Sequence, residues 1–95
     1  MKNSDLIILD WKDQSKRLLK SELVKKGLTT DELSILLSKI GINETKASID
    51  NKISRGTFSL SFYLQCRYIL DNLYEIQNKN NNVKPINDIS IKYHS

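Results

Sequence analysis

The chain has 95 residues, a single cysteine and a formal net charge of +4, with a sequence pI of about 9.2. This length suits one small domain with one core, and a single cysteine excludes an internal disulfide. No apolar run approaches the roughly 18 residues of a membrane-spanning helix, so the default expectation is a cytoplasmic protein without a membrane partner. The positive charge mildly favours polyanionic partners.

Composition divides the chain into three parts. Residues 1–10 form an N-terminal segment, in which Asp10 is a suitable N-cap for a helix that follows. Residues 11–76 show helical periodicity and predict one helical domain. Residues 77–95 are rich in asparagine and contain Pro85, which is typical of a flexible tail.

The two terminal segments also contain weak strand signals. Leu6 to Leu9 is a short apolar run, and apolar residues alternate with polar ones at Ile89, Ile91 and Tyr93. Pairing of these two runs, within one chain or between two copies, is the alternative to terminal disorder. We favour disorder.

The first predicted helix, residues 11–26, is basic and amphipathic. It contains six basic and two acidic residues, and Gly27 ends it. The expected apolar face consists of Trp11, Leu18, Leu19 and Leu23. Another face carries lysines four residues apart that are candidates for contacts with a phosphate backbone: Lys12, Lys16 and Lys20.

The second predicted helix, residues 29–40, has the clearest boundaries. Thr29 and Glu32 have the spacing of a capping box, in which each side chain bonds the backbone of the other. Gly41 supplies the left-handed residue that ends the helix. The predicted apolar stripe is Leu33, Leu36, Leu37 and Ile40.

Two further helices complete the predicted domain. Residues 43–55 form the third, with Asn43 as the expected N-cap and Gly56 as the stop. Its apolar residues are few: Ala47, Ile49 and Ile53. Residues 59–76 form the fourth, capped by Ser59 or Ser61, with the core face Phe58, Phe62, Cys66, Ile69, Leu70 and Leu73. We expect the core to be anchored by Trp11, Phe58 and Phe62.

No group of residues has the spacing of a catalytic or metal-binding site. The single histidine, His94, lies next to the last residue and has no neighbouring partner. Cys66 lies among apolar residues and is expected to be a core thiol. We therefore expect no enzyme activity, no metal and no cofactor.

The predicted third helix is polar over most of its surface, which favours a role in binding. An α-helix fits the major groove of DNA, where its side chains reach base edges and phosphates, so double-stranded DNA is the expected partner. Glu44 and Asp50 keep the net charge of residues 43–56 at +1, which is low for a strong non-specific binder. The candidate DNA-binding residues are Thr45, Lys46, Ser48, Asn51, Lys52, Arg55 and Thr57.

Several motifs resemble known families. The block 27–34 resembles the opening of the second helix in phage-repressor-type helix-turn-helix domains, and Ile53-Ser54-Arg55-Gly56 is similar to the end of their recognition helix. Residues 11–73 resemble a family of small uncharacterised bacterial domains more closely. The resemblance lies in the blocks 17–23, 27–33, 51–59 and 62–66. Both resemblances imply an all-α, repressor-like fold, and only the first implies DNA binding.

We therefore expect an all-α bundle of four main helices that contains a helix-turn-helix. The first hypothesis is a transcriptional regulator that binds DNA as a homodimer. The second is a protein-interaction module, which the spacing from Leu33 to Gly41 favours because it is about one turn longer than in compact repressors. Its expected sign is an exposed apolar patch near Tyr63, Tyr68 and Tyr74. The third is non-specific binding of nucleic-acid backbone through the lysines of the first helix.

Overall fold

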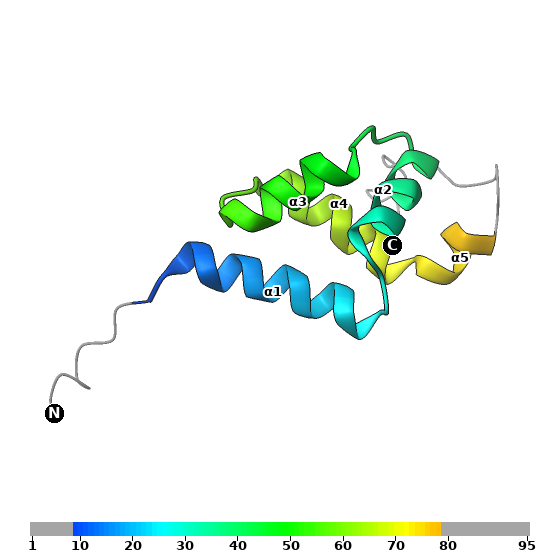
Figure 1. The fold of residues 1–95 in the computed structure, drawn as a ribbon. Helices are drawn as coiled ribbons and strands as arrows, with labels where there is room; N and C mark the ends of the chain where they lie inside the picture. The colour runs from blue at the N-terminus through cyan, green and yellow to red at the C-terminus, as the bar shows by residue number, and fades with distance from the viewer. Residues whose placement is uncertain (1–8, 79–95) are drawn as a thin grey trace, which may run out of the picture.

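A computed structural model of the chain describes residues 9–78. These residues form five α-helices and no strand (Figure 1): α1 Trp11–Lys25, α2 Thr30–Lys39, α3 Lys46–Arg55, α4 Leu60–Asp71 and α5 Leu73–Asn78. The predicted all-α bundle with four main helices is confirmed. The predicted strand at Ile89, Ile91 and Tyr93, most of the run from Leu6 to Leu9 and most of the predicted tail lie outside the described residues.

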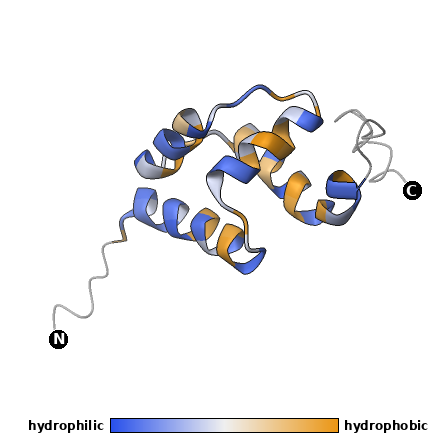
Figure 2. Cartoon of the chain, turned by 45° about the vertical axis from the view of Figure 1, so that its right-hand side comes forward, coloured by the Kyte–Doolittle hydropathy of each residue, from blue (hydrophilic) through white to orange (hydrophobic). Residues whose placement is uncertain are grey.

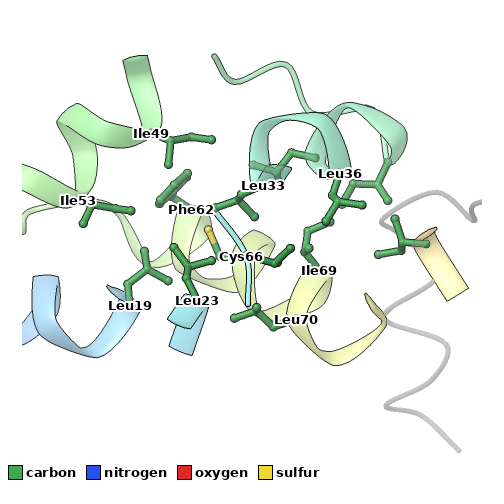
Figure 3. Packing of buried hydrophobic residues seen from close by; sticks show 14 residues of the cluster. Leu19, Leu23, Leu33, Leu36, Ile49, Ile53, Phe62, Cys66, Ile69 and Leu70 are labelled. Carbon is green, nitrogen blue, oxygen red and sulfur yellow. The ribbon is translucent and has the colours of Figure 1, made fainter. Parts of the chain in front are cut away.

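The helices pack around one apolar core. α1 contacts α3 and α4, while α2 contacts α3, α4 and the short α5. Figure 3 shows side chains from α1, α2 and α3 converging on Phe62 and Cys66 of α4. The predicted stripe of α2 is buried throughout, and Ile49 and Ile53 are the only buried side chains of α3. Because α3 buries so narrow a stripe, most of its surface faces solvent or its polar neighbours.

The predicted starts of α1 and α2 are confirmed. The Asp10 carboxylate accepts the backbone N–H groups of Lys12 and Asp13 at 3.1 and 3.2 Å. Thr29 and Glu32 form both hydrogen bonds of the capping box, at 3.1 and 2.9 Å. These bonds satisfy N–H groups that have no acceptor within the first turn of a helix.

The predicted apolar face of α1 is only half correct. Leu19 and Leu23 are buried, but Trp11 is 69% exposed and Leu18 is 49% exposed. The buried residues of α1 form a narrow stripe with a spacing of four. Leu18 lies outside this stripe because it is about 100° around the helix from Leu19. The predicted aromatic anchor is correspondingly different. Phe58 makes an edge-to-face contact with Phe62 at 5.8 Å between ring centroids, and Tyr63 replaces Trp11 as the third ring.

The third helix begins later than predicted. Asn43 does not cap it; the Thr45 hydroxyl accepts the Ser48 N–H at 3.1 Å, and the helix starts at Lys46. Residues 42–45 instead form a non-helical connection, which the Ser34 hydroxyl holds by donating to the Glu44 carbonyl at 2.6 Å. The helix ends as predicted at Gly56, whose φ of +67° is left-handed.

The predicted fourth helix is interrupted near its C-terminal end. Ser59 caps α4 by accepting the Phe62 N–H at 3.0 Å, but the helix breaks at Asn72, and α5 continues to Asn78. The Asn72 side-chain amide donates to the Tyr68 carbonyl at 2.9 Å, which competes with the regular backbone pattern. The break allows α5 to bury Ile76 against the core.

Candidate functional site

One face of α3 points away from the core and is exposed. Ile49 and Ile53 face the core, so a helical period of 3.6 residues places the opposite face at positions 47, 51, 54 and 55. The residues there, all exposed, are Ala47, Asn51, Ser54 and Arg55. We call these four residues the outer face of α3. The helix has ten residues and is therefore about 15 Å long.

One flank of α3 is a polar cluster against α4. The Lys52 ammonium contacts Glu44 Oε2 at 3.0 Å, and the Ser48 hydroxyl donates to Glu44 Oε1 at 2.7 Å. Lys52 also lies 5.4 Å from the ring centroid of Phe62. The side chains of Lys52 and Glu44 are only 31% and 16% exposed. Lys52 and Ser48 are thus occupied within the domain.

The cluster keeps Glu44 ionised. Burial of the Glu44 carboxylate acts to raise its pKa, but hydrogen bonds from Ser48 and Lys52, together with the Lys52 charge, outweigh burial and hold the pKa below its ordinary value. The negative charge of Glu44 is therefore neutralised within the domain by the ammonium group of Lys52.

The other flank of α3 carries a second ion pair. Lys46 contacts Asp50 at 2.6 Å, one helical turn away, and both side chains are about half exposed. Hydrogen bonds from Lys46 and then from Thr30 hold the pKa of Asp50 below its ordinary value. Both acidic residues of the region are consequently paired with lysines beside the outer face.

The structure sorts the predicted DNA-binding residues into two groups. Thr45, Lys46, Ser48 and Lys52 act as a cap or as partners of acidic residues. Asn51, Arg55 and Thr57 are exposed and make no side-chain hydrogen bond or ion pair within residues 9–78. Ala47 and Ser54 share the outer face but are absent from the sequence-based set. The spacing of Ile49 and Ile53 would have revealed both.

The predicted backbone-contacting lysines lie beside α3. The backbone carbonyl of Lys12 packs against Gly56, at the end of α3. Lys16 and Lys20 border a groove of about 440 Å³ between α1, α3 and the start of α2. The N-terminal half of α1 is hydrophilic (Figure 2). Lys16 and Lys20 therefore line the side of α1 that faces α3, and the backbone of Lys12 contacts the end of α3.

The described residues offer little for other chemistry. Burial raises the pKa of the Cys66 thiol to about 12, so this thiol stays protonated near neutral pH. Among residues 9–78, no cluster of three or more His, Cys, Asp or Glu side chains is arranged to hold a metal ion. No helix in that range is long and apolar enough to cross a membrane.

Comparison with models of protein families gives a match. Residues 11–73 match the family model described as a domain of unknown function, DUF6471, from the first residue of α1 to the first residue of α5. Comparison with curated proteins and with solved structures gives no match.

Proposed function

The chain belongs to the DUF6471 family, and from its geometry we propose that it is a DNA-binding regulator that places the outer face of α3 in the major groove. The observation that carries this proposal is the pairing of both acidic residues. Glu44 and Asp50 are bound by Lys52 and Lys46 on the two flanks, so the outer face carries no carboxylate. The net charge of +1 in this region is therefore that of Arg55, which lies on the outer face.

The side chains of the outer face have chemistry suited to base edges. An asparagine amide such as that of Asn51 can form two hydrogen bonds with adenine, and the Ala47 methyl group can contact the methyl group of thymine. Arg55, one turn after Asn51, can reach guanine or a phosphate, and Thr57 can donate to a phosphate beyond the helix end. In this proposal α2, the turn and α3 act as a helix-turn-helix unit.

The lysines of α1 supply the sequence-independent part of the binding. Lys16 and Lys20 line the same groove as Ser54, which belongs to the outer face. They therefore lie at its edge, where phosphates would pass, and Lys12 lies near the end of α3. Each lysine that neutralises a phosphate releases a counterion and makes binding sensitive to salt. One such domain offers few contacts, so we propose a homodimer that binds paired half-sites in the cytoplasm.

The test is fluorescence anisotropy with labelled duplexes, using random and genomic fragments at two salt concentrations. Affinity should fall steeply with salt and should favour a subset of fragments. No binding at low salt would overturn the proposal. Equal affinity for all fragments would instead favour non-specific backbone binding through the α1 lysines. Sedimentation of the chain with and without DNA tests the homodimer.

A protein-interaction module is the second candidate, because α4 exposes two leucines one turn apart. Leu60 is 71% exposed and Leu64 is 55% exposed. The predicted tyrosine patch differs from this: Tyr74 is 77% exposed, whereas Tyr63 and Tyr68 pack partly buried against the core. The test is a pull-down with the wild type and with Leu60→Asp/Leu64→Asp. If the wild type retains a protein partner that the variant loses, and the chain does not bind DNA, protein interaction replaces DNA binding as the proposed function.

A further inference from the structure

The groove beside α3 has an apolar floor and a polar border. Its apolar lining comes from α1, α3 and the turn between α1 and α2: Leu23, Val24, Leu28 and Ile53. Val24 is 77% exposed, so apolar surface is accessible there. The polar lining consists of Lys16, Lys20, Thr29, Thr30, Asp50 and Ser54. A volume of about 440 Å³ is within the range of ligand sites in proteins.

The charges around the groove are unbalanced. Neither Lys16 nor Lys20 has an ion-pair or hydrogen-bond partner for its side chain within residues 9–78. The single carboxylate of the lining, Asp50, is held by Lys46 at 2.6 Å. Thr29 and Thr30 start α2, and the first turn of a helix has a partial positive charge. The groove thus combines two uncompensated cations with apolar surface.

We propose that this groove is a docking site for an acidic segment of a partner protein that also carries apolar side chains. Carboxylates of the segment pair with Lys16 and Lys20, and its apolar side chains cover Val24 and the floor beneath. The distance along α1 from Lys16 to Val24 is about 12 Å, which matches about four extended residues or two helical turns. The inference does not depend on DNA binding.

The apolar floor favours a peptide over a nucleic acid. A sugar-phosphate backbone would neutralise the two lysines but has no apolar side chain to cover Val24. An acidic peptide with apolar residues uses both properties of the groove, because each buried apolar side chain contributes to affinity in addition to the charges. Val24 is therefore the residue that distinguishes the two kinds of ligand.

The experiment uses the full chain and a fluorescein-labelled peptide of about 12 residues in which glutamate and leucine alternate. Two control peptides carry lysine in place of glutamate or serine in place of leucine. The groove variants are Lys16→Glu/Lys20→Glu and Val24→Asp. Their matched controls are Lys25→Glu/Lys26→Glu at the C-terminal end of α1 and Ile35→Asp, another exposed apolar position, all outside the groove lining. Circular dichroism checks that each variant is folded.

Binding of the glutamate–leucine peptide should weaken by about tenfold or more in both groove variants and remain unchanged in both controls. Amide chemical shifts should move at Val24, Thr30 and Ser54. Absence of binding, or equal binding of the serine control peptide, overturns the proposal. Loss in Lys16→Glu/Lys20→Glu without loss in Val24→Asp also overturns it, since the lysines would then bind polyanions in general.

Discussion

The backbone of Gly56 lies against the carbonyl group of Lys12, so closely that a Cβ added to Gly56 would overlap the Lys12 oxygen. This contact joins the end of α3 to the start of α1, and the glycine also has a left-handed φ of +67°. Gly56→Ala should therefore suffer both conformational strain and a steric clash, with a total loss of about 2–4 kcal/mol in the free energy of unfolding. Urea denaturation followed by circular dichroism measures the loss.

Gly27 provides a control with nearly the same φ. Its φ is +68°, but nothing lies within 4 Å of the Cβ position. Gly27→Ala should lose only the conformational part, about 1–2 kcal/mol. Equal losses for the two variants would show that the contact with Lys12 has no energetic consequence.

The features that could be predicted from the sequence depend on residues close together in the chain. The cap at Asp10 and the capping box at Thr29 each involve residues within three positions, so spacing alone indicates them. The stripe of α2 was predictable for the same reason. The outer face of α3 follows from its two isoleucines once the helix boundaries are known.

The features that could not be predicted depend on how the helices meet. Glu22 of α1 accepts hydrogen bonds from Arg67 at 2.8 Å and from Tyr63 at 3.2 Å, although these residues are over 40 positions away. Glu44 pairs with Lys52 although Glu44 precedes the first residue of α3 and Lys52 lies within the helix, so helical spacing does not indicate the pair. The exposure of Trp11 has the same origin, because a periodic pattern does not show which apolar residues a neighbouring helix will cover.

The ion pair of Glu44 and Lys52 should make stability depend on acidic pH. The pKa of Glu44 is lowered in the folded chain, so its contribution is complete above its ordinary pKa of 4.5 and is lost as pH falls through the folded value. Glu44→Gln should cost about 1–2 kcal/mol near neutral pH, and the difference from wild type should shrink below pH 4.5. Urea denaturation at a series of pH values measures this difference. Exposed Glu75→Gln is the control, and a difference for Glu44→Gln that stays constant with pH would contradict the prediction.

The thiol of Cys66 should be unreactive in the folded chain. It is fully buried, and its pKa of about 12 leaves almost no thiolate at about pH 8. The rate of modification by the disulfide reagent DTNB should therefore be limited by opening of the core. This rate should increase strongly once urea unfolds the chain. The absorbance of released thionitrobenzoate follows the reaction. Equal rates in the presence and absence of urea would show that the core around Cys66 is open to solvent.

Substitutions on the outer face of α3 should affect DNA binding differently from substitutions on its flanks. Asn51→Ala and Arg55→Ala should each weaken binding to a preferred duplex by about 1–3 kcal/mol, and Asn51→Ala should also reduce discrimination among fragments. Both side chains are exposed, so the free energy of unfolding should hardly change. Asn78→Ala on α5 and Lys25→Ala on α1 are the controls for loss of an amide and of a charge. Anisotropy titrations measure the affinities.

Lys46→Ala and Lys52→Ala should behave differently from the outer-face variants. Each removes the partner of an acidic residue, so each leaves a negative charge beside the outer face. Lys52→Ala should in addition lower the free energy of unfolding, because the carboxylate of Glu44 is largely buried and would lose its counter-charge. The resulting repulsion should weaken binding to all fragments alike and leave the preference among them unchanged. If Lys46→Ala or Lys52→Ala alters the preference while Asn51→Ala does not, the flanks and not the outer face read the bases.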